Sequence, residues 1–295
     1  MPLTKKNITV IIVTFKSTDV IHNCIQSISK NIDIIIIENS KDEGFKFELE
    51  KKYPNVKCFL SNSNLGMGRG NNFGLKNVKT DFAFILNPDV ILYKKTIQRM
   101  IESSYNLDEF SIIAPISKNP NYPNYKLSEK KGQKFNNKKP FKVISVDGYA
   151  MLLNLKRINK LKIFKNFNYF DKNIFLYLEN DDLCKRLIDH NENIFIIPLS
   201  KIIHLGSKGT NVKYSNEIEL SRNWHWNWSK FYFNKKHFGK YFAFKVCLPS
   251  FITALVKYTF YLIFMNNKKY VYEKKISGFF NAMIGKKSWY RPNIK

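Results

Sequence analysis

Apolar and polar positions along the first half of the chain follow the pattern of strands separated by helices. Runs that are apolar at nearly every position predict buried strands at residues 8–14, 34–37, 56–60 and 82–86. Residues 19–29 place apolar side chains at helical spacing, and the glycine-rich segment 66–78 has the pattern of a helix start. Strands that are apolar on both faces indicate a mostly parallel sheet covered by helices on both sides. We therefore expect an α/β domain of the nucleotide-binding type, with ligands at the carboxyl ends of the strands.

The pattern weakens after residue 114. Residues 118–142 carry eight lysines and three prolines without a sustained period, which predicts a long loop. Strand-like patterns return at residues 143–146, 150–153 and 194–197, and residues 183–188 have helical spacing.

A second change in composition near residue 214 predicts a separate C-terminal region. Trp224, Trp226 and Trp228 are interleaved with lysines, and residues 248–265 are apolar apart from Lys257, one serine and threonines. A membrane-spanning helix needs about 20 apolar residues, and both Pro249 and Lys257 weaken this segment as a span. An interfacial or re-entrant segment and a buried helix of a small bundle are equally compatible with the pattern. We expect one domain at residues 1–213 and a helical, basic and aromatic appendage at residues 214–295.

The charge of the chain is strongly positive and uneven. The 49 Lys and Arg exceed the 23 Asp and Glu by 26, and residues 201–295 hold 18 of the basic residues against three acids, a local excess of 15. Such a surface attracts phosphate groups, whether of nucleic acid, anionic lipid or nucleotide. The four cysteines have neither disulfide-scaffold nor zinc-site spacing, and no signal-peptide pattern opens the chain, so we expect a reducing, cytoplasmic setting.

Two acids follow predicted strands, where they would face a ligand. Asp89, in Leu86-Asn87-Pro88-Asp89-Val90, could hold a divalent cation against a diphosphate, or it could form a turn and cap the next helix. Glu38 could contact a base or ribose, or it could be a solvated turn acid.

Three further features could carry chemistry. Glycines 66, 68 and 70 would let the backbone approach a phosphate beside Arg69, although no P-loop pattern is present. Acids at residues 179, 181 and 182 open a predicted helix, either as a general base or as ordinary partners of the helix dipole. His204 follows a predicted strand and is either a metal ligand or a structural histidine.

Taken in order, these segments resemble glycosyltransferase family 2, in particular its rhamnosyltransferase-like branch acting on bacterial cell-surface polysaccharides. The matching segments are Val10-Ile-Ile-Val-Thr-Phe, Ile36-Ile-Glu-Asn-Ser, Asn64-Leu-Gly-Met-Gly-Arg-Gly-Asn-Asn-Phe-Gly, Leu86-Asn-Pro-Asp-Val, Val146-Asp-Gly-Tyr-Ala-Met, residues 170–183 and Ile203-His-Leu-Gly-Ser. They cover about the first 210 residues, and their order carries the resemblance. The family implies the GT-A fold, a nucleoside-diphosphate-sugar donor and a divalent cation, Mg²⁺ or Mn²⁺.

The resemblance also implies roles for individual residues. Asp89 stands at the metal-binding acid of the DxD motif, and His204 matches a late histidine that completes the metal–diphosphate site. The residues implied to bind the donor are Thr14, Glu38, Asn64, Gly66, Arg69, Asn71, Asn87, Asp147 and Gly148. The branch favours dTDP-rhamnose as the donor.

One departure from the family pattern concerns the catalytic base. The branch usually has Glu-Asp-x-Asp-Leu where this chain has Glu179-Asn180-Asp181-Asp182-Leu183. Because an amide cannot deprotonate a hydroxyl, Glu179 or Asp182 must act as the base, with Glu179 preferred, or the enzyme is impaired.

The implied reaction is a single in-line displacement that inverts the anomeric configuration. The basic C-terminal region then predicts a polyprenyl-diphosphate-linked glycan acceptor at an anionic membrane, and a peripheral location on the inner face of a bacterial plasma membrane. Residues 118–142 are a candidate acceptor lid. The alternatives are a nucleic-acid-binding protein that uses residues 224–236, for which the sequence has no recognisable motif, and a catalytically impaired scaffold.

Overall fold

The structure, a computed structural model, describes residues 2–119, 122–127, 138–206 and 209–294. The chain forms two compact units, Met1–Phe170 with Asn180–Asn211, and Asp171–Glu179 with Val212–Lys295. The expected boundary at residue 213 lies close to the second break, at Asn211. The short segment Asp171–Glu179, however, packs with the C-terminal helices, because Phe175 stacks on His225 and Ser229 Oγ donates to the carbonyl of Leu176.

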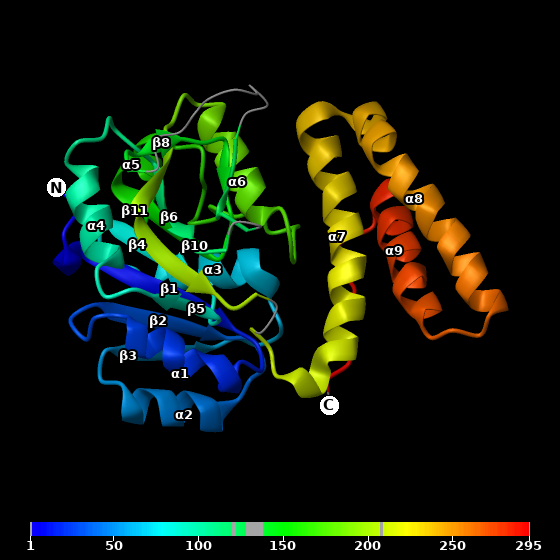
Figure 1. The fold of residues 1–295 in the computed structure, drawn as a ribbon, viewed down its shortest axis with the longest axis horizontal. Helices are drawn as coiled ribbons and strands as arrows, with labels where there is room; N and C mark the ends of the chain where they lie inside the picture. Colours follow the sequence, from blue (N-terminus) through cyan, green and yellow to red (C-terminus); the bar gives the residue numbers. More distant parts are fainter. Residues whose placement is uncertain (1, 120–121, 128–137, 207–208, 295) are drawn as a thin grey trace. The chain divides into compact units, whose positions relative to one another are not determined.

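In the described part of the first unit, a nine-stranded mixed sheet forms the centre (Figure 1). Its order is β3-β2-β1-β4-β10-β6-β11-β5, with β8 beside β11. The strands are β1 (Ile8–Thr14), β2 (Asp33–Glu38), β3 (Val56–Leu60), β4 (Phe82–Leu86), β5 (Val90–Leu92), β6 (Ile112–Ser117), β8 (Phe141–Lys142), β10 (Ala150–Asn154) and β11 (Ile194–His204). A separate antiparallel pair consists of β7 (Tyr125–Lys126) and β9 (Ser145–Val146). The predicted strands of the first half are confirmed.

The sheet is parallel in its first half and mixed in its second. Strands β1 to β4 are mutually parallel, as their apolar runs predicted. Strand β10 then runs antiparallel between β4 and β6, and β5 runs antiparallel to β11. The predicted loop at residues 118–142 contains β7 and β8, and its residues 120–121 and 128–137, part of the expected lid, lie outside the described residues.

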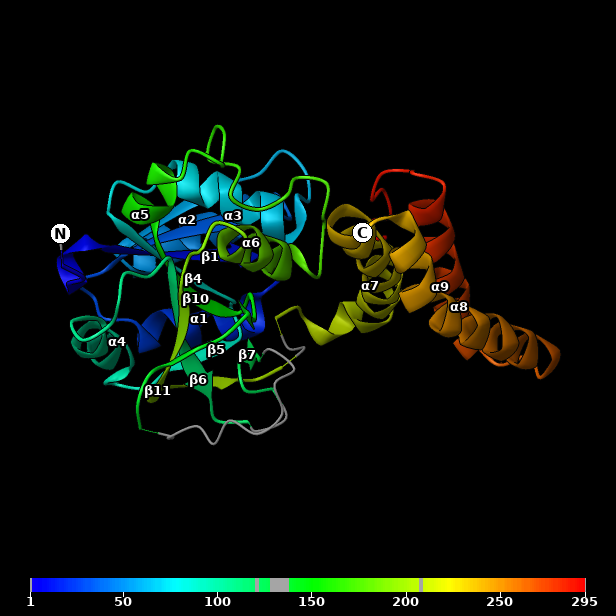
Figure 2. The ribbon, with the colours of Figure 1, turned by 90° about the horizontal axis from the view of Figure 1, so that it is seen from above.

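Helices cover both faces of this sheet (Figure 2). One face carries α1 (Thr18–Ser27), α2 (Glu43–Lys52) and α4 (Thr96–Ser104), and the other carries α3 (Gly66–Lys76), α5 (Leu155–Lys160) and α6 (Glu179–Ile188). Strand β1 is buried at every position and alternates its side chains between the two cores, with Val10 on the first face and Ile11 on the second. This explains why its sequence is continuously apolar.

Glycines in α3 allow that helix to approach β1 closely. A Cβ at Gly70 would lie 2.8 Å from Cγ1 of Val13, and one at Gly74 would lie 2.6 Å from Cγ2 of Ile11. Gly70, expected to admit a phosphate, is therefore required for contact with a buried strand.

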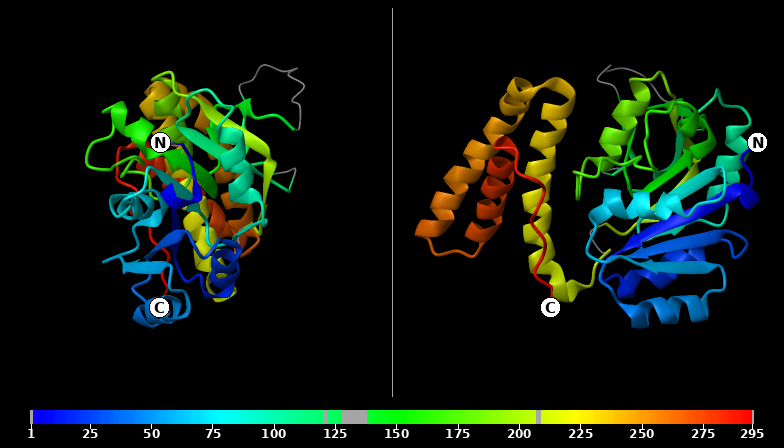
Figure 3. Two further views of the ribbon diagram at one scale, coloured as in Figure 1. Left: turned by 90° about the vertical axis from the view of Figure 1, so that its left-hand side faces the viewer. Right: turned by 180° about the vertical axis from the view of Figure 1, so that it is seen from behind.

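Among the described residues, most of the second unit consists of the helices α7 (Ser215–Phe238), α8 (Lys240–Ile263) and α9 (Lys268–Met283) (Figure 3). Their shared core contains Trp224, Trp228, Phe231, Ala243, Cys247, Phe279 and Ala282. The indole nitrogens of Trp224 and Trp228 donate to Ser277 Oγ and the Lys286 carbonyl. Both rings are buried, so they form a core and not the stacking surface that the nucleic-acid-binding alternative would use.

Candidate active site

The turn between β4 and β5 brings Asp89 to His204. Val90 pairs with His204 across the antiparallel β5–β11 contact, and the amide of Leu205 donates to the Asp89 carbonyl at 3.0 Å. Asp89 Oδ2 lies 3.5 Å from His204 Nε2, and Asp89 is only 3% exposed. His204 is the last residue of β11, which continues well beyond the predicted residues 194–197. Two side chains that are distant in sequence therefore meet at one edge of the sheet.

The Asn87-Pro88-Asp89 segment is a turn, and it also presents side-chain oxygens. The amide of Val90 donates to the Asn87 carbonyl at 3.1 Å, which closes the turn. Asp89 does not cap the next helix, because α4 begins at Thr96 with Lys95 as its N-cap. Within the described residues, Asp89 Oδ1 and Asn87 Oδ1 are buried without a hydrogen-bond partner. The predicted turn is confirmed and the predicted helix cap is wrong, and the turn leaves both side-chain oxygens available to a ligand.

These groups fit a divalent cation. A carboxylate, an amide oxygen and an imidazole are ligands that Mg²⁺ or Mn²⁺ accepts, and buried oxygens without partners are unfavourable unless a ligand satisfies them. No group of three or more His, Cys, Asp and Glu side chains placed to hold a metal occurs in the described part of the chain. The described residues therefore offer an incomplete set of ligands, which suits a cation that also binds a diphosphate.

Tyr149 holds the ring of His204, a contact that the sequence did not indicate. The two rings stack with centroids 4.0 Å apart, and Tyr149 Oη donates to the Tyr122 carbonyl at 2.9 Å. Burial raises the pKa of Tyr149, so its hydroxyl stays protonated and available as a donor. The preceding Asp147 also has a raised pKa, mainly through burial, with Lys126 and His204 acting in the opposite direction.

Thr14 and Glu38 lie opposite each other at the carboxyl ends of β1 and β2. Glu38 is 1% exposed and is not the solvated turn acid considered above. Its carboxylate accepts hydrogen bonds from the Ser40 amide at 2.7 Å, the Asp42 amide at 3.1 Å and the Ser40 hydroxyl. Thr14 Oγ1 donates to the Ile37 carbonyl at 3.4 Å. Glu38 therefore shapes the turn at this edge of the sheet.

The start of α3 approaches the same edge. Asn64 Oδ1 accepts from the Gly66 amide at 3.0 Å, and Asn39, which the sequence did not single out, donates to the Gly66 carbonyl at 3.2 Å. Arg69 is exposed, whereas Asn71 is 3% exposed. Asn71 Oδ1 has no hydrogen-bond partner among the described residues. Asn71 is thus a further buried acceptor in the predicted donor-binding segment.

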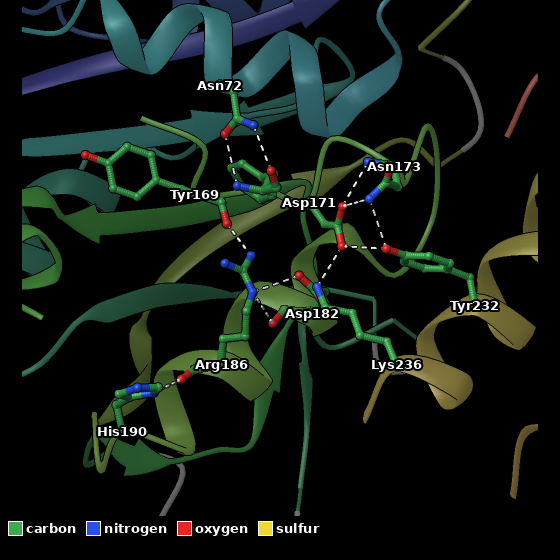
Figure 4. Close-up of polar contacts among 10 residues, drawn as sticks. Asn72, Tyr169, Asp171, Asn173, Asp182, Arg186, His190, Tyr232 and Lys236 are labelled. Carbon is green, nitrogen blue, oxygen red and sulfur yellow. Dashed lines mark hydrogen bonds and ion pairs between the residues drawn. The ribbon is translucent and has the colours of Figure 1, made fainter. Parts of the chain in front are cut away.

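The acids at the start of α6 differ in their surroundings. Asp182 is fully buried, and its Oδ2 accepts from Arg186 Nε at 2.9 Å (Figure 4). Asp181 binds Lys126 Nζ at 2.7 and 2.8 Å and Ser145 Oγ at 2.7 Å. These two acids are therefore held in ion pairs.

The other two polar residues at this end of α6 are Glu179 and Asn180. Glu179 is the first residue of the helix and is 7% exposed. Asn180, at the departure from the family pattern, donates to the Val146 carbonyl at 2.7 Å. Its side chain also lies beside Gly148, where an added Cβ would be 3.5 Å from Asn180 Cβ.

Polar contacts hold the start of the segment that precedes α6 (Figure 4). Asn72 both donates to and accepts from the backbone of Phe170, at 2.8 and 2.9 Å. Within the second unit, Asp171 accepts from Tyr232 Oη at 3.0 Å and Lys236 Nζ at 2.7 Å.

A comparison with protein families assigns the first unit. The model of glycosyl transferase family 2 matches residues 9–161, more than half of the chain. The chain belongs to this family. The match includes Asp89 and ends before the α6 acids and His204.

Related proteins carry the same assignment. A low-salt glycan biosynthesis hexosyltransferase, Agl10, from Haloferax volcanii is 24% identical over 218 residues, which cover 67% of each chain. An uncharacterized glycosyltransferase from Rickettsia conorii is 26% identical over 130 residues, 44% of this chain and 20% of that protein. The role of this family 2 chain is therefore glycosyl transfer.

Solved structures show the GT-A fold. The mannosyltransferase PcManGT from Pyrobaculum calidifontis, in complex with GDP-Man and Mn²⁺, aligns with a TM-score of 0.56 and 8% identity, over 94% of this chain and 87% of that one. GalNAc-T7 with UDP, GalNAc and Mn²⁺ aligns with a TM-score of 0.51 and 15% identity, over 77% of this chain and 49% of that one. At these identities the likeness establishes the fold.

Proposed function

We propose that this protein is a metal-dependent, inverting glycosyltransferase that moves a sugar, rhamnose or a similar hexose, from a nucleoside diphosphate to a growing glycan. The observation that carries the proposal is the Asp89–His204 pair. A buried carboxylate with one oxygen unsatisfied among the described residues lies 3.5 Å from an imidazole, at the carboxyl end of a strand. Ligands bind at this end of the strands in open α/β sheets.

In this proposal Asp89 and His204 hold the cation, and Asn87 supplies a nearby oxygen. A bound divalent cation neutralises charge that develops on the leaving diphosphate, the main electrostatic demand of the reaction. Tyr149 fixes the plane of the His204 ring by stacking, and the hydrogen bond to Tyr122 fixes Tyr149 in turn. These contacts thus orient the metal-binding side chains before the sugar donor binds.

The donor would lie along the carboxyl ends of β1, β2 and β4. We assign Thr14, Glu38, Asn64, Gly66, Arg69, Asn71, Asn87, Asp147 and Gly148 to its binding, as the family resemblance implies. Two observations support this assignment. Thr14 and Glu38 lie side by side at the carboxyl ends of β1 and β2. Asn71 presents a buried oxygen that has no hydrogen-bond partner among the described residues and could accept a hydrogen bond from the nucleotide sugar.

For the catalytic base we assign Glu179, with Asp182 second. Asp182 is fully buried and paired with Arg186, so protonating it would break an ion pair in the core. Glu179 stands at the first position of α6, where a carboxylate is stabilised by the helix dipole.

The acceptor in this proposal is a polyprenyl-diphosphate-linked glycan, reached from the inner face of a bacterial plasma membrane. The basic excess of 15 in residues 201–295 supports a partner that carries phosphate at an anionic surface.

A catalytically impaired scaffold is the second candidate, and Asn180 favours it. Its amide bonds the Val146 carbonyl at 2.7 Å, so the residue has a structural role at the position where the branch carries an acid. Such a protein would bind donor without turnover.

Calorimetry of donor binding tests the metal site. Asp89→Ala should abolish the Mn²⁺-dependent part of donor affinity, whereas Asp108→Asn, at an acid whose side chain is 76% exposed, should leave it unchanged. Unchanged affinity in Asp89→Ala would remove this residue from the site.

Turnover of a bound donor tests the base. Glu179→Gln should lower kcat about 100-fold or more with donor affinity retained, since general-base catalysis contributes roughly that much. If the wild type binds the donor without turnover and Asn180→Asp gains turnover, the scaffold candidate is correct. Equal kcat for Glu179→Gln and wild type would exclude Glu179 as the base.

A further inference from the structure

Helix α8 has an inner face that packs within the second unit. Ala243, Cys247 and Ala254 recur at helical spacing and are at most 4% exposed. They contact the core of α7 and α9, which includes Phe279. This inner face is enough to pack α8 into the core of the three-helix unit.

The outer face of α8 is also apolar, and it is exposed. Leu248, Ile252, Leu255 and Val256 repeat at spacings of four, three and one, and they are 44%, 51%, 40% and 64% exposed. Ile263 continues the face two turns later at 69%. A helix that is hydrophobic all round belongs inside a protein core or in lipid, yet nothing in the described part of the chain covers this face.

Of the helices that the structure describes, α8 alone is long and apolar enough to cross a membrane. At its C-terminal end the apolar surface continues through the exposed Phe264 and Met265 into the turn that leads to α9. The outer face and this turn, residues 248–265, are called the α8 apolar surface below.

Lysines and tyrosines border the α8 apolar surface. Lys257 Nζ lies 5.6 Å from the centroid of the Tyr272 ring, and Lys268 Nζ lies 5.9 Å from that of Tyr261. Lys269 lies 5.3 Å from the ring of Tyr270, which is 49% exposed. Amphipathic aromatic rings beside cationic side chains are typical of protein surfaces that lie at the membrane headgroups. Each lysine there is attracted to anionic lipid.

We propose that the α8 apolar surface inserts into one leaflet of an anionic bilayer, with the lysines of α8 and α9 at the headgroups. The helix does not span the bilayer in this proposal. Helix α9 returns alongside α8, and Lys268 contacts Tyr261, so a span would carry the lysines of α9 into hydrocarbon, which is costly. Monotopic insertion buries the apolar side chains and keeps every lysine at the surface.

The inference deepens the membrane-facing part of the proposed function, because it names the surface that would meet a lipid-linked acceptor. Its test needs no donor or turnover. A chain that binds vesicles but no nucleotide sugar would refute the proposed function alone, and the reverse result would refute this inference alone.

Flotation of the full chain with vesicles tests the apolar contact. Wild type should float with vesicles that contain phosphatidylglycerol, and Ile263→Glu or Val256→Glu should bind them about tenfold more weakly or worse, because each loses a buried aliphatic side chain. Phe47→Glu is the matched control: this side chain in α2 is 68% exposed, against 69% for Ile263, and carries the same charge change. The control should float like wild type.

The charge requirement needs a second pair of variants. Lys268→Gln with Lys269→Gln should weaken binding to these vesicles roughly thirtyfold, since each lysine near the surface contributes about a fivefold gain. Lys51→Gln with Lys52→Gln in α2 should change it little. Added salt should reduce binding, and phosphatidylcholine vesicles should bind less.

Three results would overturn the inference. Equal flotation of Ile263→Glu, Val256→Glu and wild type would show that the α8 apolar surface does not contact lipid. Labelling of Met265→Cys, at a side chain 86% exposed beyond the end of α8, by a membrane-impermeant thiol reagent enclosed inside the vesicles would show a span. A wild-type dimer in sedimentation that Ile263→Glu dissociates, together with no flotation of wild type, would show that a second copy of the chain covers the surface.

Discussion

Gly70→Ala distinguishes a glycine that packs against β1 from one that admits a phosphate. The added Cβ would lie 2.8 and 3.0 Å from the two methyl groups of Val13, closer than ordinary contact. Val13 is 3% exposed on a strand that pairs on both sides, so neither partner can move freely. Overpacking of this kind costs roughly 1–3 kcal/mol, and the better helix propensity of alanine returns up to about 1 kcal/mol. We expect the first unit to lose about 1–2 kcal/mol of unfolding free energy.

Urea unfolding can follow the two units separately. All four tryptophans lie in the second unit, so tryptophan fluorescence reports the unfolding of that unit alone. Far-ultraviolet circular dichroism reports the loss of secondary structure in both units. Gly70→Ala should move the transition of the first unit and leave the fluorescence midpoint unchanged. Gly44→Ala, where the added Cβ would meet its nearest atom at 3.5 Å, is the control and should stabilise slightly.

A double mutant tests the assigned contact itself. Because Val13→Ala removes the methyl groups that Gly70→Ala would meet, the combined loss should be smaller than the sum by about 1 kcal/mol. If Gly70→Ala is at least as stable as wild type, the packing argument is wrong. Loss of donor affinity at unchanged stability would instead support the phosphate role.

Two further predictions concern the second unit. Burial lowers the pKa of His225 from 6.5 to about 3, so the unfolded chain binds its proton first on acidification, and this unit should lose stability as pH falls across that window. His225→Asn should flatten the dependence of the fluorescence midpoint on pH, and an unaltered slope would refute the assignment. Gly278→Ala places a Cβ 3.0 Å from the carbonyl carbon of Trp224 and closer still to its oxygen, so it should cost more than about 2 kcal/mol. A fluorescence midpoint at or above that of wild type would contradict this close helix contact.

The sequence predicted the first four strands because burial on both faces leaves a continuous apolar run. It predicted only the first part of β11, since Pro198, Ser200 and Lys201 interrupt the pattern. The structure shows a shift in the pairing with β6 between Ile197 and Lys201, after which the strand continues to His204. The last part of β11 is held by its pairing with β5 and β6, which are distant in sequence, so a local pattern does not predict it.

Candidate site residues were predictable where a motif marked them. Asp89 and His204 were each named from the sequence, but their approach depends on the register of β5 with β11. Tyr149 and Asn39 were missed, because a stacking tyrosine and a bridging amide have no spacing of their own. By sequence, Trp224 and Trp228 beside their lysines are compatible with a helix core and with a stacking surface, and only their burial in the fold assigns them to the core.

Thermal stabilisation by nucleotide sugars tests the central claim most directly. The panel pairs dTDP-, UDP- and GDP-linked hexoses with Mn²⁺ or with chelator, for wild type and Asp89→Ala. A donor at 100 times its dissociation constant adds about 2.7 kcal/mol to stability, which is visible as a raised unfolding midpoint. We expect one nucleotide family to raise the midpoint of wild type, only with metal, and not that of Asp89→Ala. A midpoint that no donor raises, or one raised equally in both proteins, would contradict a metal-dependent donor site at Asp89.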